Sequence, residues 1–524
     1  MKLRTIVKIA ITSSVVLLCS GFALYSFFRL SAAEGQKDFN LYELVPSTTS
    51  AVFVTDDVLE FVAEVDELTC SKNQQYLYVS KLFSYLKQSL YALSEDTPHG
   101  LSRQMNQMLI SFHEPDNERN QVLYCRLGNG DKELVNRFVR KYISSLYPPK
   151  TFIYKGEEII IYPMADGDFL ACYLTSDFMA LSFQKKLIEN VIDAYKSGKS
   201  LADDSTFTGI RAPKKSAAAA TIYTRMQGMM GWTEFDMKMK DDFIYFSGIT
   251  HDADTCFAFI NQLRQQQSVK GFPGEVLPST AFYFSRQGIT DWVSLLSFGN
   301  AQEQNGAVRT SEVQNRDKEF SRYLMENAGQ DLVACLFQRE DTLQGAAAVL
   351  SLSVADVTEA ERMLRALVNA ASADEGRRNP RITFCYTVNK AYPIYRLPQT
   401  TLFEQLTSFA EPTLDVYAAF YGGRLLLAPD ADALAHYIRQ LDKGEVLNGA
   451  MVYQTGMDHL SDSYHFMLMA DFDHIFQQSE NHVRFVPDFF LRNADFFRHF
   501  TLFVQFACAD GVVYPNIVLK YKSE

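Results

Sequence analysis

The sequence is poor in cysteine and in basic residues, and each shortage argues against a class of protein. Eight cysteines are spread over 524 residues, and no two of them form a C-x-x-C pair. So sparse a set does not make a disulfide-dense scaffold in a chain of this size. Acidic residues outnumber basic ones by 62 to 50, and the net charge is −12. An acidic body repels phosphate backbones, so we expect no nucleic-acid partner.

The sequence also lacks the short motifs of common catalytic sites. It has no G-x-S-x-G, no G-x-x-x-x-G-K-[ST], and no G-x-G-x-x-G after an expected strand. His113-Glu114 has no second histidine at the spacing of a zinc-protease helix. We therefore assign no catalytic and no cofactor-binding residue, and a protein without enzymatic activity is the simpler interpretation. Many hydrolases use scattered carboxylates without a local motif, so an enzyme stays open as an alternative.

One cluster of potential metal ligands stands out in the segment "ADFDHIF". It contains Asp471, Asp473 and His474, and His465 lies a few residues before it. The spacing matches no zinc or facial-triad pattern. In the repeat alignment described below, we place this segment opposite "ATIYTRM", which has no set of ligands. We therefore predict no metal site.

Two further clusters of polar residues have simple structural interpretations. The stretch "SDSYH", Ser461 to His465, contains serine, aspartate and histidine, but a catalytic triad is assembled in space and not along the chain. The acid pairs Glu157-Glu158 and Asp203-Asp204 are most simply solvated turns. None of them is assigned to a site.

The N-terminal segment is the strongest single signal. Residues 9–28, "IAITSSVVLLCSGFALYSFF", carry no charge, and a helix of that length spans about 30 Å, the thickness of a bilayer core. Three basic residues precede the segment, which predicts a cytoplasmic N-terminus and an extracytoplasmic body. A cleaved signal peptide ending near Ser31-Ala32-Ala33 is the main alternative, and lipidation at Cys19 is a minor one. No other stretch is as long and uncharged, so one pass is expected.

The remainder has the composition of a folded protein with more than one core. Apolar residues make up 47% and charged residues 21% of the chain, which excludes wholesale disorder. The chain is longer than chains that normally fold around a single hydrophobic core. The 40 phenylalanines and 27 tyrosines suit sheet faces and helix–sheet cores. Five cysteines lie in apolar runs and are expected to be buried on strands: Cys125, Cys172, Cys335, Cys385 and Cys508.

Two parts of the chain resemble each other. "ELVPSTTSAVFV" from Glu43 and "EVLPSTAFYF" from Glu275 align at a spacing of 232 residues, and "TFIY" from Thr151 meets "TFCY" from Thr383 at the same spacing. The segment that begins at Phe178 then aligns with the one at Arg424, 246 residues later. The last match pairs "FDMKMKDDFIYFSG" from Phe235 with "VQFACADGVVYPNI" from Val504. Four matches in the same order indicate an internal duplication.

The repeated segments predict the same local elements in both parts. Ile188, Ile192 and Tyr195 mark one apolar helix face. Gly198 and Gly444 follow the two helices as terminators. Two hairpin turns are expected at Asp241-Asp242 and Asp510-Gly511, and two helix starts at Asp131 and at Asp356 with Glu359.

These observations predict an α+β fold of two tandem related units, each made of antiparallel hairpins with helices packed on one face, after an N-terminal transmembrane helix. Residues 73–94 are expected to form a helix with a core-facing stripe that includes Leu82. The boundary between the units falls near "RQQQSVKGFPG" (264–274). The predicted segments are a cytoplasmic stub (1–8), the anchor (9–28), a linker (29–40), a first repeat (41–268) and a second repeat (269–524).

With the anchor, "LVPST", "LISFHE" and the closing "NIVLKY", the chain resembles a family of uncharacterised single-pass bacterial envelope proteins with a duplicated exterior region of unknown function. The resemblance implies a location in the inner membrane, with the bulk of the chain in the periplasm. It supplies no catalytic residues.

The expected function is that of a membrane-anchored envelope protein that acts by binding or scaffolding, with another envelope protein as a possible partner and an unknown ligand. A hydrolase of cell-wall or glycan substrates is one alternative, and a carbohydrate-cleaving pocket would hold converging carboxylates or a Ser/His pair. A carrier of a hydrophobic ligand is the other, and its pocket would be apolar and aromatic.

Overall fold

The structure is a computed structural model of the chain. It describes residues 39–73, 105–114, 119–128, 131–138, 147–164, 167–211, 218–225, 231–250, 258–290, 311–339, 346–375, 382–388, 390–397, 399–407, 415–478 and 488–522, with the single residues Leu82, Trp292, Leu295 and Val486. The predicted cytoplasmic stub (1–8), the anchor (9–28) and most of the linker (29–40) lie outside these ranges.

The prediction of a single-pass membrane protein is contradicted. Among the described residues, no helix is long and apolar enough to cross a bilayer. The assignment to the inner membrane is corrected with it, because that assignment rested on one uncharged segment, 9–28, which itself lies outside the described residues. The alternative of a cleaved signal peptide is left open by this finding.

Among the described residues, twenty strands belong to one sheet. Ten of them come from the first part of the chain: β1 (Ala51–Thr55), β2 (Met108–Phe112), β3 (Gln121–Arg126), β4 (Lys150–Tyr154), β5 (Glu157–Pro163), β6 (Phe169–Leu174), β7 (Phe178–Ser182), β8 (Ala220–Thr224), β9 (Thr233–Lys240) and β10 (Phe243–Thr250). The other ten are β12 (Ala281–Gly288), β13 (Ala328–Phe337), β14 (Ala347–Val354), β15 (Ile382–Tyr386), β16 (Ala391–Arg396), β17 (Tyr417–Tyr421), β18 (Arg424–Ala428), β20 (Phe466–Asp471), β21 (Phe500–Ala509) and β22 (Val512–Tyr521). A small second sheet joins β11 (Val269–Lys270) to β19 (Ser463–Tyr464).

Helices connect these strands. In the first part they are η1 (Leu41–Leu44), α2 (Val58–Glu67), α3 (Thr69–Lys72), α5 (Asp131–Phe138), α6 (Lys185–Ser197), α7 (Ser205–Ile210) and α8 (Ala258–Gln265). In the second part they are η3 (Pro273–Glu275), α10 (Ser311–Asn327), α11 (Val357–Glu375), α12 (Leu402–Leu406), α13 (Ala431–Asp442), η4 (Leu447–Gly449), α14 (Met451–Met457), α15 (Phe472–Phe476), α17 (Asp488–Arg492) and α18 (Ala494–Phe497).

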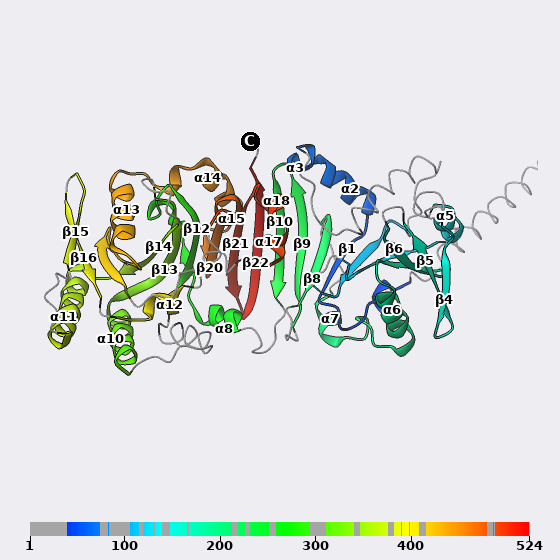
Figure 1. Cartoon of the computed structure of the whole chain (residues 1–524), viewed down its shortest axis with the longest axis horizontal. Helices are drawn as coiled ribbons and strands as arrows, with labels where there is room; N and C mark the ends of the chain where they lie inside the picture. The colour runs from blue at the N-terminus through cyan, green and yellow to red at the C-terminus, as the bar shows by residue number, and fades with distance from the viewer. Residues whose placement is uncertain are drawn as a thin grey trace, which may run out of the picture.

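Every pairing in the large sheet is antiparallel, and the strands follow one another in a single row. The order across the sheet is β4, β5, β6, β7, β3, β2, β1, β8, β9, β10, β22, β21, β20, β12, β13, β14, β18, β17, β16, β15. We call the strands from β4 to β10 the first half and those from β22 to β15 the second half. Figure 1 shows the two halves on either side of the central strands.

The two halves pair their strands in the same order, counted outward from the middle of the sheet. They meet where β10 pairs with β22, and we call this pairing the seam. Ser247 lies directly opposite Asn516 in the seam. Asn516 is also the residue that corresponds to Ser247 when the hairpin turns at Asp241 and Asp510 are aligned. The halves are therefore related by an approximate two-fold axis through this pair. The domain boundaries 41–268 and 269–524 stay a prediction.

The hairpin turns next to the seam confirm one local prediction. Asp241 has a φ of 50° and Asp510 a φ of 51°, and each begins a two-residue connection between neighbouring strands. Hairpin turns of types I′ and II′ have a positive φ at their first central residue, and aspartate and glycine tolerate it better than other residues. Gly511, with a φ of 77°, completes the second turn.

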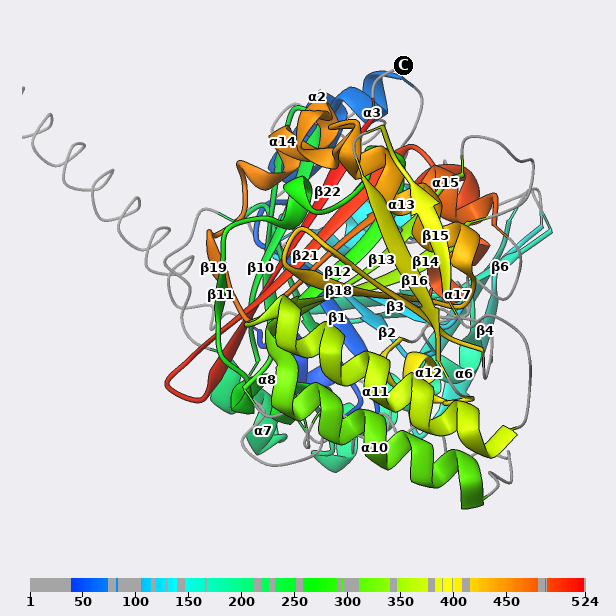
Figure 2. The ribbon, with the colours of Figure 1, turned by 90° about the vertical axis from the view of Figure 1, so that its left-hand side faces the viewer.

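The predicted fold class is wrong in two respects. The structure has one continuous sheet where two separate sheet units were expected, and helices cover both of its faces. Leu123 on β3 belongs to the same core as Phe61 on α2, whereas its neighbour Tyr124 belongs to a core with Ile188 on α6. Figure 2 shows the same arrangement in the second half, where α10 and α11 lie on one side of the strands and α13 lies on the other.

Several helix predictions hold. Ile188 and Ile192 are fully buried, and Gly198 ends α6 in the left-handed conformation with a φ of 63°. Gly444 follows α13 with a φ of 76°. Tyr195, expected on the apolar face of α6, is instead exposed.

The predicted helix starts differ in detail. The Asp356 carboxylate accepts hydrogen bonds from the backbone N–H groups of Thr358 and Glu359 at 2.9 and 3.1 Å, so it caps α11 as expected. Asp131 is itself the first residue of α5, and its carboxylate accepts from the backbone N–H of Gly128. Apart from residue 73 and Leu82, which is buried, the helix predicted at 73–94 lies outside the described residues.

The cysteines behave largely as expected. Four of the five predicted strand cysteines are buried, and Cys508 is half-buried. Burial raises the pKa of Cys125 and Cys172 to about 12, so these thiols are poor nucleophiles. The described cysteines are all unpaired thiols.

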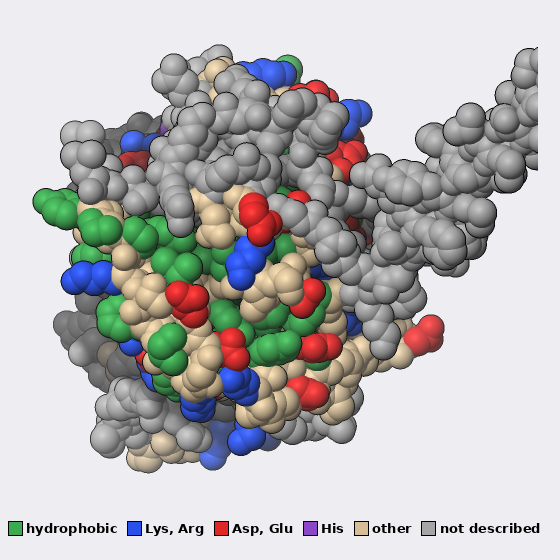
Figure 3. Space-filling view, turned by 90° about the vertical axis from the view of Figure 1, so that its right-hand side faces the viewer, with side chains coloured by type: hydrophobic (Ala, Val, Ile, Leu, Met, Phe, Trp, Pro, Cys, Tyr) green, Lys and Arg blue, Asp and Glu red, His purple; other side chains and the backbone are tan. Residues whose placement is uncertain are grey.

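Strands β4 and β15 form the two outer edges of the sheet, and both expose large apolar side chains. Phe152 and Ile153 are exposed on β4, and Phe384 and Tyr386 are exposed on β15. Figure 3 looks at the first-half end and shows hydrophobic side chains at the surface there. The "TFIY" and "TFCY" segments that match in sequence therefore lie at opposite ends of the molecule.

Candidate functional site

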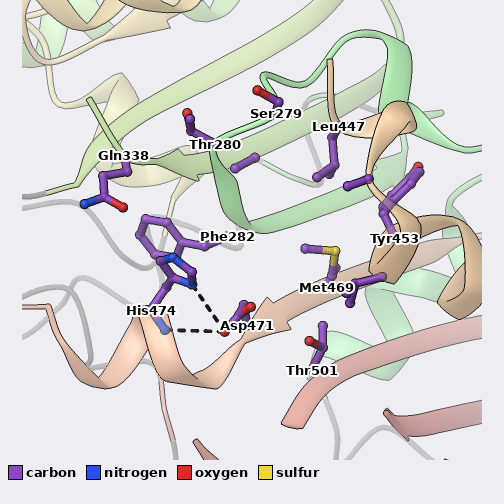
Figure 4. A pocket seen from close by; sticks show the side chains of 13 residues that line it. Ser279, Thr280, Phe282, Gln338, Leu447, Tyr453, Met469, Asp471, His474 and Thr501 are labelled. Atoms are coloured by element: carbon purple, nitrogen blue, oxygen red, sulfur yellow. Dashed lines mark hydrogen bonds and ion pairs between the residues drawn. The ribbon is translucent and has the colours of Figure 1, made fainter. Parts of the chain in front are cut away.

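A cavity of about 240 Å³ lies in the second half, where the first residues of β12, the last residues of β20 and the segment around α14 meet. Figure 4 shows the side chains that line it. They are Ser279, Thr280, Ala281, Phe282, Gln338, Leu447, Ala450, Val452, Tyr453, Met469, Asp471, His474 and Thr501.

The chain builds this cavity through a few fixed connections. Pro278 forms an isolated bridge with Val446, which brings the entry to β12 against η4. Asp471, the last residue of β20, pairs with Thr501 on β21. The walls are therefore supplied by paired backbone, which holds their positions without a ligand.

Most of the cavity wall is apolar. Leu447, Tyr453 and Met469 are almost completely buried around it. The Phe282 ring stacks on the imidazole of His474, with the ring centres 5.9 Å apart and the planes 15° from parallel. The wall therefore offers flat and polarizable surfaces, which suit a planar apolar group.

One end of the cavity is charged. The backbone N–H groups of Asp473 and His474 donate to Oδ1 of Asp471 at 3.0 and 3.4 Å, so Asp471 caps α15. Lys522 Nζ lies 2.7 Å from the same oxygen, and His474 Nδ1 lies 3.4 Å from it. The carboxylate is thus already neutralised by residues of its own chain.

These contacts shift the pKa of both partners in the expected directions. Burial by itself raises the pKa of Asp471, but the contacts with His474 and Lys522 outweigh it, and the pKa of this carboxyl lies below its usual value. The Asp471 carboxylate raises the pKa of His474 more than burial lowers it. Asp471 is therefore charged near neutral pH, and a protonated His474 is favoured beside it.

Two hydroxyl groups in the wall, those of Thr501 and Tyr453, have no hydrogen-bond partner among the described residues. The Thr501 side chain is fully buried, and its hydroxyl has no hydrogen-bond partner among the described residues. A buried hydroxyl without a partner costs about 1–3 kcal/mol. The hydroxyl oxygen of Thr501 has less than 1 Å² of accessible surface, so a ligand atom reaches it only when the Thr501 side chain turns toward the cavity.

The cavity does not form a catalytic triad. It holds serine, histidine and aspartate, but Ser279 lies at the opposite end from His474 and Asp471, and no hydrogen bond joins the serine to the histidine (Figure 4). Nucleophilic catalysis needs the nucleophile and its base within hydrogen-bond reach. Asp471 is also occupied as a helix cap and by Lys522. The arrangement supports binding better than bond cleavage.

The four residues considered as metal ligands do not lie together in the structure. Asp471 and His474 lie together in the cavity, whereas Asp473 faces Arg498, with 3.8 Å between Oδ1 and Nε. Nδ1 of His465 accepts a hydrogen bond from the backbone N–H of Cys508 at 3.1 Å. Within the described ranges, no three His, Cys, Asp or Glu side chains are grouped to hold a metal ion.

The "SDSYH" stretch is structural. The backbone of Ser461 exchanges two hydrogen bonds with the side chain of Gln505. The carboxylate of Asp462 accepts from the backbone N–H of Gly271 at 3.1 Å. With His465 bonded to Cys508, the three polar residues bond to three separate residues, Gln505, Gly271 and Cys508, and do not form a triad.

The acid pairs are more ordered than solvated turns would be. Glu157 accepts a hydrogen bond from Tyr173 at 3.0 Å and pairs with Lys196 at 2.8 Å. Asp203 accepts from Ser200, and Asp204 caps α7. Asp203 is exposed at a turn, as expected, and Asp204 starts a helix, whereas Glu157 is the first residue of β5 and does not lie in a turn.

His113 is also structural. Its Nε2 lies 2.9 Å from the hydroxyl of Ser111, which in turn lies 3.0 Å from the hydroxyl of Tyr124. Burial lowers the pKa of His113 to about 4. A neutral, half-buried imidazole of this kind supports packing at the end of β2.

A cluster of buried charges around Asp331 lies outside the cavity, and its carboxylate is paired with two arginines. Asp331 accepts from Arg286 Nε at 3.0 Å and lies 3.3 Å from Nη1 of Arg424. Arg286 also donates to the carbonyl of Gly271 at 2.8 Å, and Arg424 donates to Ser351. Through Gly271, the cluster holds the segment that connects the two halves against the second half. Its role is therefore structural.

Sequence reasoning missed most of the cavity. Phe282, Tyr453 and Thr501 are apolar or weakly polar, and no motif marks them. The one usable signal is a difference in residue type between equivalent positions of the two halves.

The search for relatives adds no function. The resemblance to bacterial envelope proteins that was drawn from "LVPST" and "NIVLKY" stays a prediction. No model of a known protein family, no curated protein and no solved structure matches the chain.

Proposed function

We propose that the protein is a binding module that takes a small ligand into the cavity of its second half. The observation that carries this proposal is the combination of a preformed, mainly apolar cavity of about 240 Å³ with a buried hydroxyl, that of Thr501, which has no partner among the described residues. Ligand sites are typically concave and apolar with a few placed polar groups.

The size of the cavity limits the ligand. Pockets for drug-sized molecules measure about 300–1,000 Å³. At about 240 Å³, this cavity suits a molecule of one or two rings and does not suit a long lipid chain. Among the functions considered from sequence, ligand binding is therefore favoured over lipid transport, and the missing Ser279–His474 contact argues against a hydrolase.

The test is ligand-observed NMR with a fluorinated fragment mixture on the full chain and on an Ala450→Leu variant. Ala450 lines the cavity, and a leucine there would occupy its volume. We expect some fragments to bind the wild-type protein, and the same fragments to lose binding in the variant.

The matched control is Met451→Leu. Met451 is the next residue along the chain, is 76% exposed and does not line the cavity. It should bind the fragments as the wild type does, and all three proteins should melt alike. If every fragment binds the wild type and Ala450→Leu equally, the cavity is not a binding site and the proposal fails.

A further inference from the structure

The two halves of the sheet can be aligned residue by residue around the cavity. An isolated bridge joins Pro46 to Ser200 in the first half, and the equivalent bridge joins Pro278 to Val446 in the second. The bridges fix spacings of 232 and 246 residues between equivalent positions. These spacings agree with the two sequence matches that were found without the structure.

The hairpin turns fix the alignment of the next strands. Asp241 and Asp510 begin the equivalent turns, so β9 and β21 are aligned at a spacing of 269 residues. At that spacing, Thr501 occupies the position of Trp232. The residue that lines the cavity with a free hydroxyl therefore replaces a tryptophan of the first half.

The strand that contains Asp471 is aligned at a spacing of 246 residues, which places Asp471 at the position of Arg225. The sequence alignment had set the "ADFDHIF" segment against "ATIYTRM", four positions away from this register, because it lacked the strand pairing. The same spacing places Ala450 at the position of Asp204. The second half thus has an acidic residue in place of the basic Arg225, and an alanine in place of the acidic Asp204.

In the first half, these side chains fill the site. Trp232 is 1% exposed and packs against Phe207, with ring centres 5.0 Å apart. The guanidinium of Arg225 lies 5.0 Å from the centre of the indole and 3.9 Å from the carboxylate of Asp204. Arg225 also donates a hydrogen bond to the carbonyl of Ser47.

In the second half, the same place is open. Thr501 stands in place of the indole, and Met469 stands in place of Tyr223. Ser279 corresponds to Ser47, and its carbonyl receives no hydrogen bond from the described residues once the arginine is absent. The cavity therefore corresponds to the space that the first half fills with the indole of Trp232 and the guanidinium of Arg225. The donor to the Ser47 carbonyl there is Arg225, and Nε1 of Trp232 has no hydrogen-bond partner among the described residues.

We propose that the ligand of this cavity is a compact, uncharged, planar aromatic molecule with an N–H donor, of the indole class. The ring takes the place that Trp232 takes in the first half, stacked near Phe282 and Met469, and the N–H donates to the carbonyl of Ser279 or to the hydroxyl of Thr501. This inference rests on the proposed function and gives it a ligand class.

The absence of charge follows from the pairing of Asp471. Its carboxylate already contacts Lys522 at 2.7 Å and His474 at 3.4 Å. A charged ligand would lose hydration without finding an unpaired charge of opposite sign. Indole should therefore bind better than tryptamine, which is cationic, and better than indole-3-acetate, which is anionic.

The experiment measures binding of 5-fluoroindole to the full chain by ¹⁹F NMR line broadening, with indole, tryptamine and indole-3-acetate as competitors. Thr501→Trp installs the first-half residue and should weaken binding by about tenfold or more, since its side chain occupies the ring site. Thr501→Ser keeps the small hydroxyl side chain and should bind as the wild type does. Ala450→Leu is a second filling variant in case the tryptophan prevents folding.

The outcomes separate this inference from the proposed function. Binding of 5-fluoroindole that is lost in the filling variants and displaced best by indole supports the ligand class. Equal binding to the wild type and to a folded Thr501→Trp variant overturns it. A third outcome is that 5-fluoroindole does not bind, while aliphatic or charged fragments bind the wild type and lose binding in Ala450→Leu. The cavity is then a binding site, but the proposed ligand class is wrong.

Discussion

Trp232 and Thr501 occupy equivalent positions in the two halves of one sheet, and each lies beside the end of the neighbouring strand. Where the chain has the tryptophan, the space is filled, and where it has the threonine, a cavity of about 240 Å³ remains. The first half therefore serves as an internal reference for the second, because it shows which side chains the same backbone can accommodate.

Removing the tryptophan should cost stability. Trp232→Ala takes a fully buried indole out of its contacts with Phe207 and should lower the free energy of unfolding by about 3–5 kcal/mol. Urea unfolding followed by circular dichroism measures this. Thr501→Val, which removes an unpartnered hydroxyl, should change the free energy by less than about 1 kcal/mol or raise it. A larger loss from the valine than from the alanine would contradict the assignment.

The packing around Tyr453 requires a glycine at position 274. A Cβ at this position would lie 2.6 Å from a ring carbon of Tyr453, far closer than real contacts allow. Gly274→Ala should therefore lower the midpoint of thermal unfolding by about 1–3 °C if the strain costs 1–3 kcal/mol, because an unfolding entropy of about 2 cal/mol/K per residue amounts to about 1 kcal/mol/K for a chain of 524 residues. The control is Gly209→Ala in α7, where nothing lies within 4 Å of the added carbon and where the change should be neutral or stabilising. Equal melting of the two variants would count against this packing.

The lowered pKa of His113 predicts that the folded protein loses stability in acid. Its folded pKa is about 4, well below the value of about 6.5 expected in the unfolded chain. As the pH falls below 6.5 the unfolded chain binds the proton first, so the free energy of unfolding falls until the pH reaches about 4, by up to about 3 kcal/mol. Urea midpoints at pH 7.5 and 4.5 measure it, and His113→Gln should lose less stability between the two. The same acid loss in both proteins would place its cause elsewhere.

The seam can be tested by a cross-link. Ser247 and Asn516 lie directly opposite each other, within the distance that a disulfide spans. The double variant Ser247→Cys, Asn516→Cys should form a bond under mild oxidation that peptide mass spectrometry locates. Ser247→Cys with Tyr514→Cys, displaced by two residues, should not. Cross-linking of the displaced pair alone would show a different register.

Local elements could be predicted from sequence because short-range chemistry determines them. Gly198 and Gly444 end helices since they adopt left-handed conformations without strain, and Asp241 and Asp510 suit turns of positive φ. Each of these depends on a few consecutive residues, so no knowledge of distant strands was needed.

The single sheet could not be predicted in the same way. Its continuity depends on the pairing of β10 with β22, which lies some 270 residues later in the chain. No local sequence pattern in either strand identifies the strand with which it pairs. The helices on both faces did have a signal. "MLISF" and "QVLYCR" are nearly continuous apolar runs, which indicate strands covered on both sides, whereas one covered face would give alternation.

The cavity was hidden for a related reason. It depends on a threonine where the equivalent strand has a tryptophan, and that comparison requires the correct register. The sequence alignment was four positions off at Asp471, so Arg225 and Asp471 were never compared.

The seam has a consequence for synthesis. The ribosome makes β10 long before β22, and at 5–20 residues per second the delay is on the order of tens of seconds. Throughout that delay the outer edge of β10 lacks its partner and offers a row of open backbone groups to any nascent chain nearby. A truncated translation product that stops before residue 512 would keep this edge open permanently, so chaperones or proteases must deal with every such fragment.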